Sequence, residues 1–408
     1  MTLYEELKWR GLIKDVTSPE LENKLNNEKL TFYIGTDPTA DSMHIGHYSS
    51  FLIAKRLAKA GHKPLLLIGG ATGRIGDPRP TTEREMKSIE EIEKNTKNLK
   101  KQAEEIFVFE VVDNYDWIKN INIIEFLRDY GKYFNINYML DKDIIRRRLE
   151  TGITFTEFSY MLLQSLDFLH LHETRGVNLQ VAGSDQWGNI TSGVDLIRKK
   201  LGDEVYAFTM PLILDQNGKK FGKSEGNALW LDKNKTSSYE LYQYLINTDD
   251  SMIESYLKVF TFLSPEEIMD IVSKHNNEPH LRLGQKTLAR EIITDLHGKE
   301  EYEKAVQISE NLFSGNIKEI NVNDLMIGLK DVPHFILKDE SLLDLLVNNN
   351  ICSSKREARE FLGNNAISVN GEIVNDENMF IDKTKTIEGK IVVIRRGKKK
   401  YYVGLVEE

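Results

Sequence analysis

Short apolar runs alternate with longer amphipathic stretches over the first half of the chain. The runs at 31–35, 65–68 and 108–112 are rich in β-branched, aromatic or leucine residues, which is typical of buried strands. The stretches 84–105 and 121–133 have the pattern of helices. Strands and helices in alternation predict a parallel sheet covered by helices. Ligands of such folds bind beyond the carboxyl ends of the strands.

The pattern changes twice in the second half. Strand signals fade after about residue 230, and Ser237 and Ser264 each begin a segment with the spacing of a helix capping box. Near the end, Ser354 begins a third such segment, and 366–374 has the pattern of a hairpin around an Asn-Gly turn. These changes predict an α/β domain at 1–225, a helical domain at 226–325, a linker at 326–340 and a small α+β domain at 341–408.

Composition and charge narrow the class of protein. A chain of 408 residues is too long for one core and suggests two or three domains. No long apolar run and no apolar signal core at the N-terminus are present, so we expect no membrane span and no export. The single cysteine, Cys352, cannot form an internal disulfide, which favours the reducing cytoplasm. The net charge of -9 argues against a uniformly basic surface, so any RNA contact must come from local patches.

Two histidines lie where the predicted strand at 31–35 passes into a predicted helix at 48–58. The segment His44-Ile-Gly-His47 occupies this junction. The first turn of a helix points free N–H groups outward, which suits phosphate, and residues three apart share one face of a helix. Gly46 leaves room for a flat adenine or a ribose against the backbone. The alternative is a helix start with two surface histidines.

A second cationic segment, Lys220-Phe-Gly-Lys223-Ser224, follows an apparent strand end at 212–214. It precedes a stretch rich in Gly, Asn and Asp, so we expect an exposed and pliable loop. Lysines on such a loop suit a transition state whose negative charge grows on a leaving pyrophosphate. The alternative is a solvated basic turn.

Basic side chains also gather near the end of the chain. Residues 341–408 hold eleven Lys and Arg against ten Asp and Glu, a net of +1 on an otherwise acidic protein. Lys355, Arg356, Arg359 and the run at 395–400 could together form one phosphate-binding face. A small domain with a solvated basic tail is the alternative.

Several motifs resemble one protein family. The HIGH and KFGKS segments are similar to the signature pair of class I aminoacyl-tRNA synthetases, and Gly183-Ser-Asp-Gln-Trp-Gly-Asn189 resembles the tyrosine-specific members. Further similar runs lie at 37–41, 69–78 and 155–160. The similarity covers nearly the whole chain, which is identified as a member of the bacterial-type tyrosyl-tRNA synthetase family. Its last segment resembles an S4 RNA-binding module.

The resemblance implies a Rossmann-like catalytic domain, then an α-helical domain and a small S4-like domain. It implies ATP-dependent formation of tyrosyl-AMP from L-tyrosine, followed by transfer to tRNA, in a cytoplasmic homodimer. Mg2+ would arrive with ATP, and no tightly bound cofactor is expected. The residues implied to act on the phosphates are His44, His47, Lys220, Lys223 and Ser224. Those implied to hold ATP or the adenylate are Gly35, Asp37, Thr39, Gly46, Gly183, Asp185 and Gln186.

Amino-acid choice and tRNA binding fall to other residues in the resembled family. Tyr33 and Asp167 match the positions that meet the phenol hydroxyl, and those around the ammonium group are Asp77, Tyr160 and Gln164. The last two and Asp167 are spaced four and three apart, so one helix face would carry all three. The alternative is a set of buried polar groups that satisfy one another. The expected tRNA contacts are Lys355, Arg356, Arg359, Arg395, Arg396 and Lys398.

Three other features are assigned no function. His170 and His172 are two apart and diverge on a helix, so they make no zinc site, and the acidic run at 90–93 is a solvated helix face. The loop at 79–84 is shorter and less basic than the family pattern, so no role is predicted for Arg79 or Arg84.

Two other functions stay open at this point. One is another class I synthetase, with tryptophan as the nearest competing substrate. The S4-like end and the pair formed by Tyr33 and Asp167 argue against it. The other is a non-catalytic RNA-binding descendant, which the intact HIGH and KFGKS segments disfavour.

Overall fold

The computed structural model describes residues 1–79, 82–224, 227–397 and 400–407, without the side chains of 223, 224 and 227. The chain divides into two compact units. The first unit holds residues 1–236 and 248–291, and the second holds residues 237–247 and 292–408. The expected division at 225, 325 and 340 stays a prediction.

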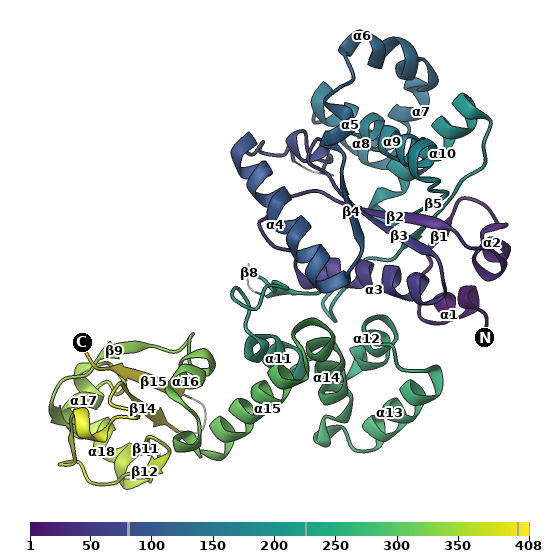
Figure 1. Cartoon of the computed structure of the whole chain (residues 1–408). Coiled ribbons are helices and arrows are strands. Elements are labelled where there is room, and N and C mark those ends of the chain that lie inside the picture. The colour runs from purple at the N-terminus through teal and green to yellow at the C-terminus, as the bar shows by residue number, and fades with distance from the viewer. Residues whose placement is uncertain (80–81, 225–226, 398–399, 408) are drawn as a thin grey trace. The chain divides into compact units, whose positions relative to one another are not determined.

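A six-stranded sheet forms the centre of the first unit, with strand order β1-β6-β5-β2-β3-β4 (Figure 1). The strands β2 to β6 run parallel and β1 pairs antiparallel with β6, so the predicted parallel sheet is confirmed. The connections from β2 and β5 diverge where these two strands lie side by side, and a ligand crevice is expected at their carboxyl ends. The strands are β1 (Asp15–Val16), β2 (Thr31–Thr36), β3 (Lys63–Ile68), β4 (Glu110–Asp113), β5 (Leu179–Gly183) and β6 (Tyr206–Met210).

Helices cover both faces of this sheet, α3 and α4 on one face and α9 and α10 on the other (Figure 1). Side chains alternate along β2, so Tyr33 packs with Leu65 and Phe168 on the α9 side while Phe32 and Ile34 point to the opposite face. All five are buried. The helices are α3 (Ile45–Lys59), α4 (Ile89–Phe107), α9 (Phe155–Arg175) and α10 (Trp187–Leu201), and α1 (Leu3–Trp9) and α2 (Leu21–Asn27) precede β2.

One predicted strand differs from the structure. A buried strand is expected at 108–112, but β4 begins at Glu110 and lies at the edge of the sheet with partly or fully exposed residues. Val108 instead ends α4 in a left-handed conformation with φ 56° and is 83% exposed. An edge strand has a neighbour on one side only, and an apolar composition does not reveal this.

A run of short helices connects β4 to α9. The helix predicted at 121–133 is present as three successive helical turns, of which the middle one is a π-helical turn at Phe126–Tyr130. The short helices are α5 (Tyr115–Ile118), α6 (Ile123–Glu125), α7 (Ile136–Leu140) and α8 (Asp143–Arg148).

Helices dominate the chain after β8 (Asn227–Ala228), as predicted. Two of the three expected capping boxes are formed, at Ser237 with Glu240 and at Ser264 with Glu267. At the third, Ser354 accepts from the N–H of Glu357, but the carboxylate of Glu357 accepts from Ser353 instead, so the box is not reciprocal. The helices of this stretch are α11 (Ser238–Ile246), α12 (Ile253–Phe260), α13 (Pro265–Asn277), α14 (Leu283–His297), α15 (Lys299–Ser314) and α16 (Val322–Gly328).

A five-stranded sheet of order β12-β11-β14-β15-β9 closes the second unit. The predicted turn is confirmed, because Asn370 and Gly371 both have positive φ and join β11 to β12. The expected linker at 326–340 holds the end of α16 and strand β9, which pairs in parallel with β15. The elements here are β9 (His334–Ile336), β10 (Glu340–Ser341), α17 (Leu342–Asn348), α18 (Lys355–Gly363), β11 (Ile367–Val369), β12 (Glu372–Ile373), β13 (Phe380–Ile381), β14 (Ile391–Arg396) and β15 (Lys400–Leu405).

One face of that sheet packs against α15 and α16. Ile391, Val393 and Val403 share a buried cluster with Leu312 and Leu325. The hydroxyl of Tyr401 also donates to the carbonyl oxygen of Leu312, at 2.7 Å. The strands and these two helices therefore share one core within the second unit.

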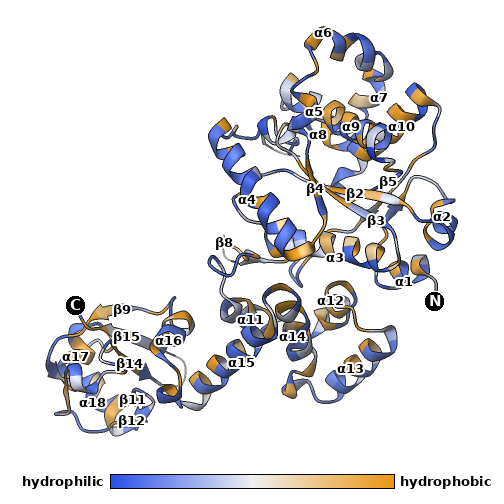
Figure 2. Ribbon diagram, in the orientation of Figure 1, coloured by the Kyte–Doolittle hydropathy of each residue, from blue (hydrophilic) through white to orange (hydrophobic). Residues whose placement is uncertain are grey.

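Apolar and polar residues are mixed along most helices, whereas β2 and the core of the sheet are mainly apolar (Figure 2). Among the described residues, no helix combines the length and the apolar character needed to cross a membrane.

Candidate active site

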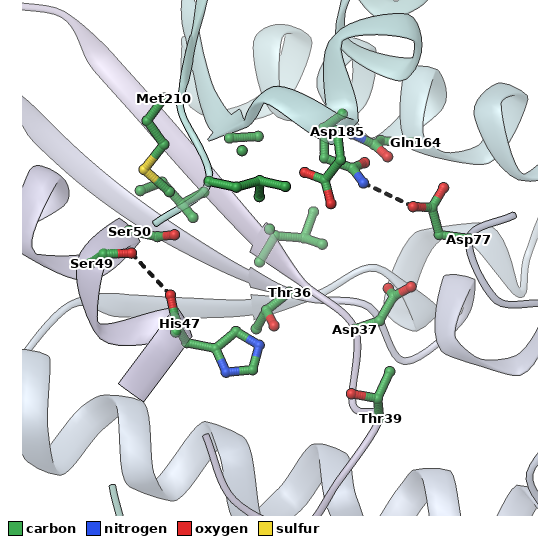
Figure 3. A pocket seen from close by; sticks show the side chains of 18 of the residues that line it. Thr36, Asp37, Thr39, His47, Ser49, Ser50, Asp77, Gln164, Asp185 and Met210 are labelled. Atoms are coloured by element: carbon green, nitrogen blue, oxygen red, sulfur yellow. Dashed lines mark hydrogen bonds between the residues drawn. The ribbon is translucent and has the colours of Figure 1, made fainter. Parts of the chain in front are cut away.

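A cavity of about 390 Å3 lies at the carboxyl ends of β2, β5 and β6, within the first unit. Figure 3 shows that Asp37, Asp77 and Asp185 point into it at one end and that the ring of His47 lies at the other. Fifteen residues predicted for the site line this cavity: Tyr33, Gly35, Asp37, Thr39, His44, Gly46, His47, Asp77, Tyr160, Gln164, Asp167, Gly183, Asp185, Gln186 and Lys220. The predictions for the side chains of Lys223 and Ser224 fall outside the described part of the chain.

The two histidines form the first turn of α3. His44 caps the helix, and its Nδ1 accepts from the N–H of Gly46 at 3.1 Å, while Nδ1 of His47 accepts from the N–H of His44 at 3.1 Å. The rings stack with their centroids 3.9 Å apart. Because each Nδ1 accepts a hydrogen bond, each ring carries its proton on Nε2. The shared face predicted from the spacing is confirmed, and the two surface histidines of the alternative reading are not what the structure has.

Burial decides the charge of His47. Burial, together with the neighbouring His44, lowers the pKa of His47 to about 3. His47 is therefore a neutral hydrogen-bond donor at physiological pH. A Cβ at Gly46 would lie 2.8 Å from Cε1 of His44, so a side chain there would break the stack. Gly46 is needed for the histidine geometry as well as for any ligand above it.

The lysine segment is joined to the histidine segment by backbone hydrogen bonds. Lys220 lines the cavity, and strand β7 (Lys223–Ser224) pairs with β8 (Asn227–Ala228) beyond it. The chain then forms an antiparallel bridge between Trp230 and His44, flanked by hydrogen bonds from the N–H of Ile45 and of residue 231. The sequence predicts a pliable loop, and the structure has a hairpin paired to the start of α3. We call residues 213–224 and 227–231 the lysine hairpin.

The opposite end of the cavity is buried and holds Asp167 on α9. Its two oxygens accept from Nδ2 of Asn114 and Nε1 of Trp117, each at 2.9 Å. Burial nevertheless raises the pKa of Asp167 to about 8. Within the described residues, the buried hydroxyl of Tyr33 has no hydrogen-bond partner. This end of the cavity therefore offers a fixed carboxyl group and an unpaired hydroxyl.

The predicted face of α9 is confirmed, because Tyr160, Gln164 and Asp167 all line the cavity. They do not satisfy one another, as the alternative reading required. The hydroxyl of Tyr160 donates to Oδ2 of Asp37 at 2.8 Å, and Asp167 is bound by residues outside α9.

Carboxyl groups concentrate beside Tyr160. Asp77 accepts from Nε2 of Gln186 at 2.8 Å and from Nδ2 of Asn189 at 3.1 Å. Burial raises the pKa of Asp77 to about 6 and also raises that of Asp37. Three carboxyl groups, the third from Asp185, thus line one end of a cavity, and this arrangement suits a cationic group of a ligand.

Some residues at or beside the cavity were not predicted from the sequence. Asn114 and Trp117, which hold Asp167, belong to no recognised motif, and their one signal is a position directly after β4. Arg84 lines the cavity and donates from Nε to the carbonyl oxygen of Asp77. Arg79 is exposed. The structure therefore brings one of the two unassigned arginines to the site.

His170 and His172, which were assigned no function, have different neighbours. His170 stacks on Trp117 at 4.5 Å, whereas His172 contacts Asp203 and the carbonyl oxygen of Val177. Over the described ranges, no group of three or more His, Cys, Asp or Glu side chains is placed to hold a metal ion.

The basic residues predicted to contact tRNA lie in the second unit and differ in their surroundings. Lys355 and Arg359 on α18 pair with Asp344 and Glu377, at 2.7 and 2.5 Å. Arg356, also on α18, is exposed. The prediction for Lys398 falls on a residue outside the described ranges.

The two arginines on β14 do not share a face. Arg395 and Arg396 are consecutive in a strand, so their side chains point to opposite sides of the sheet. The guanidinium of Arg396 donates to the carbonyl oxygen of Ile351 and lies over the ring of Phe361. The single basic face expected from the sequence cannot include both.

Comparisons with known proteins show the family of the chain. The family described as tRNA synthetases class I (W and Y) matches residues 25–314, and the tyrosine–tRNA ligase SYY-like C-terminal domain matches residues 324–404. A tyrosine–tRNA ligase of Listeria monocytogenes serotype 4a is 49% identical over 415 residues, with 99% of each chain covered. That of Macrococcus caseolyticus is 50% identical over 410 residues, with 98% of each covered.

Solved structures give the same result. The chain resembles a C-terminally truncated mitochondrial tyrosyl-tRNA synthetase of Aspergillus nidulans with a TM-score of 0.69 and 33% identity, over 76% of this chain and 94% of that one. The resemblance found in the sequence is thus confirmed along nearly the whole chain. This chain belongs to the class I tRNA synthetase family of the tryptophan and tyrosine enzymes.

Proposed function

We propose that this protein is a tyrosine–tRNA ligase. It activates L-tyrosine with ATP to form tyrosyl-AMP and pyrophosphate, and then transfers the tyrosyl group to the terminal adenosine of its tRNA. One observation carries the proposal: a single cavity joins Tyr33 and Asp167 at one end to His44, His47 and Lys220 at the other.

The buried end selects the amino acid. The phenol hydroxyl of the substrate takes the place between Tyr33 and Asp167, where it gives the unpaired hydroxyl of Tyr33 a partner. Phenylalanine would leave the hydroxyl of Tyr33 unpaired and would make no hydrogen bond to Asp167, and it is rejected for that reason. The ammonium group binds among Asp77, Tyr160 and Gln164, at the acidic part of the wall.

The other end serves the reaction. The carboxylate of tyrosine is already charged when it attacks the α-phosphorus, so no general base is needed and positioning and charge stabilisation carry the step. His44 and His47 donate from Nε2, and Lys220 supplies positive charge as pyrophosphate leaves. Lys223 and Ser224 follow in the same hairpin. The adenylate is held by Gly35, Asp37, Thr39, Gly46, Gly183, Asp185 and Gln186.

Mg2+ enters with ATP in this proposal. The ion takes most of its ligands from phosphate oxygens and water and needs only one or two carboxylates from a protein. Asp37 and Asp185 line the cavity and supply oxygens of that kind. Bound Mg2+ would offset the negative charge of the phosphates.

Pyrophosphate exchange with tyrosine, tryptophan and phenylalanine tests the proposal. We expect exchange with tyrosine, and at least a hundredfold slower exchange with tryptophan and phenylalanine. This factor is on the order of the cost of leaving one buried donor and one buried acceptor without partners. Exchange that is fastest with tryptophan would contradict the proposal and place the protein among the tryptophan enzymes of its family. Failure to exchange with any of the three would leave it without a catalytic function.

We propose that tRNA binds the second unit through α18. The exposed side chain of Arg356 supports this placement. Arg356→Glu should slow tRNA charging and leave pyrophosphate exchange unchanged, and Lys383→Glu, an exposed site outside α18, is the control. Equal charging by the two variants would contradict the assignment. A deletion of 341–408 is a poorer test, because it would uncover the core that β14 and β15 share with α15 and α16.

We also propose that the protein is a cytoplasmic homodimer. Apolar side chains between α6 and the start of α9 stand exposed: Ile123, Ile124, Leu127, Ile136, Tyr138, Leu149 and Phe155. Orange segments on α6 and α7 in Figure 2 mark part of this group. A second copy of the chain would remove this surface from water. The single buried thiol, Cys352, fits the reducing conditions of the cytoplasm.

Sedimentation equilibrium tests the dimer. We expect the mass of two chains for the unaltered protein and for Met269→Asp, which changes an exposed apolar residue on α13. Ile124→Asp should give the mass of one chain, because it buries a charge in the interface. A monomeric unaltered protein, or a dimeric Ile124→Asp variant, would contradict this placement.

A further inference from the structure

The position of Lys220 is set by the base of the lysine hairpin. An isolated bridge pairs Leu214 with Lys220, and the N–H of Phe221 donates to the carbonyl oxygen of Ile213 at 2.9 Å. The next residue, Gly222, has φ 82°, and a Cβ there would lie 1.8 Å from Cγ2 of Ile45. The base of the hairpin is therefore in direct contact with the first residue of the histidine helix.

One side chain touches both strands of this base. Tyr256, on α12, is 2% exposed, and its hydroxyl donates to the carbonyl oxygen of Leu214 at 2.9 Å. Its ring meets that of Phe221 edge to face, with 4.6 Å between centroids. Leu214 lies on the first strand of the base and Phe221 on the second. Tyr256 therefore holds both strands at the same point of α12.

Other aromatic rings connect this point to α3. Phe260, one turn further along α12, lies 4.7 Å from the ring of Phe221 and 5.8 Å from that of Tyr256. It also stacks on Tyr48 of α3 with an interplanar angle of 3° and 6.2 Å between centroids. Tyr48 directly follows His47 in the chain. The hairpin and the histidines are thus fixed to neighbouring side chains of one aromatic cluster, formed by Tyr48, Phe221, Tyr256 and Phe260.

Two buried arginines hold the end of α12 in place. Arg10 donates to the carbonyl oxygens of Lys258 and Leu263, and Arg56 of α3 donates to that of Val259. Cations at the C-terminus of a helix also complement its dipole. Arg56 lies on α3, the helix that also carries the histidines. Its hydrogen bond to Val259 therefore fixes the end of α12 relative to the active site.

We propose that Tyr256 is a positioning residue for adenylate formation, which places Lys220 at the phosphate end of the cavity through the base of the lysine hairpin. Tyr256 is not among the residues that line the cavity, so it acts through the hairpin and not on the substrate. This inference rests on the role proposed above for Lys220. It adds a residue outside every motif found in the sequence.

Tyr256→Phe isolates the hydroxyl, because the ring and its packing remain. We expect the rate of adenylate formation at saturating tyrosine and ATP to fall about fivefold, the effect of one hydrogen bond, with the KM for tyrosine unchanged. Tyr206→Phe is the matched control, because it removes the hydroxyl of another buried tyrosine, which bonds Glu20 at 3.4 Å, away from the hairpin. The control should keep the unaltered rate.

A double-mutant cycle separates positioning from a general structural role. In a Lys220→Ala background, Tyr256→Phe should cause no further slowing, because the group that it positions is gone. The same fivefold slowing in both backgrounds, or a changed KM for tyrosine, would overturn the inference. If Lys220→Ala slows the reaction and Tyr256→Phe does not, the inference fails and the role of Lys220 stands. If Lys220→Ala has no effect, both fail together.

Discussion

The two ends of the cavity hold polar groups in opposite ways. At the tyrosine end, Asp167 is 2% exposed and held by two donors, and Tyr33 is 1% exposed with a hydroxyl that finds no partner in the described part of the chain. At the phosphate end, Lys220 is exposed and belongs to a hairpin, and His44 and His47 supply fixed donors. The polar groups of the tyrosine end are fixed before the substrate binds. At the phosphate end, the positive charge comes from a separate segment, the lysine hairpin.

The difference follows from what each end must do. Selecting tyrosine over phenylalanine requires buried groups that are costly to leave unpaired, so the binding site must be dry and fixed. Stabilising a leaving pyrophosphate requires positive charge that acts on the transition state more strongly than on bound ATP. We therefore expect changes at the tyrosine end to alter binding and selection, and changes at the phosphate end to alter the rate.

The largest effect is expected from Asp167→Ala. It removes the proposed partner of the phenol and leaves Asn114 and Trp117 without the acceptor that Asp167 provides, so kcat/KM for tyrosine should fall about a thousandfold. Pyrophosphate exchange measures this, with Asp116→Ala, an exposed carboxylate nearby, as the control. A loss smaller than tenfold in a folded variant would show that Asp167 does not bind the phenol.

Lys220→Ala should have the next largest effect. The exchange rate at saturating substrates should fall about a hundredfold because charge stabilisation is lost only in the transition state. The adjacent Lys219→Ala is the control, because Lys219 is equally exposed and does not line the cavity. Comparable losses in the two variants would show that general positive charge, and not the position of Lys220, matters.

The pH dependence of tyrosine binding should report on Asp77. Its pKa of about 6 means that the carboxyl group is protonated below that pH and then attracts the ammonium group less. Affinity should fall by up to tenfold for each pH unit below 6, and this step should vanish in Asp77→Asn. Calorimetric titration between pH 5 and 8 measures it. An unchanged step in the variant would assign the proton to another group.

The raised pKa of Asp77 also affects the stability of the free protein, and here the pH dependence runs in the opposite direction. Asp77 titrates near 3.8 when unfolded and near 6 when folded, so the folded protein binds more protons between these values. The contribution of Asp77 therefore makes the ligand-free protein less stable as the pH rises from about 4 to 6. Binding of tyrosine should offset this loss above pH 6.

The smallest effect is expected from Tyr33→Phe. Removing an unpaired buried hydroxyl should raise the free energy of unfolding by about 1 kcal/mol, while the preference for tyrosine over phenylalanine falls about tenfold. Urea unfolding and exchange assays measure the two changes. Tyr206→Phe, whose hydroxyl has a partner, should show no gain in stability. A loss of stability in Tyr33→Phe would mean that its hydroxyl is satisfied in the free protein.

Local chemistry was predictable from the sequence. The strand and helix around His44 follow from patterns within about 30 residues, and the face of α9 that carries Tyr160 and Asp167 follows from spacing alone. Motif resemblance brought in the other cavity residues that were predicted. All these predictions depend on patterns within short stretches of chain.

Long-range contacts were not predictable. Trp117 lies 50 residues from Asp167, and the bridge between His44 and Trp230 spans far more, so no local pattern signals either pair. The exposed edge strand β4 and the strand β9 inside the expected linker also depend on distant neighbours. Spacing cannot reveal which remote segment supports a residue, as Tyr256 and Leu214 illustrate.

Single-turnover formation of the adenylate over a range of tyrosine concentrations tests the division between the two ends most directly. Our account predicts that Lys220→Ala lowers the limiting rate without changing the half-saturating concentration of tyrosine, and that Asp167→Ala raises that concentration far more than it lowers the rate. If both variants change the same parameter by similar factors, the two ends do not have separate functions and the account is wrong.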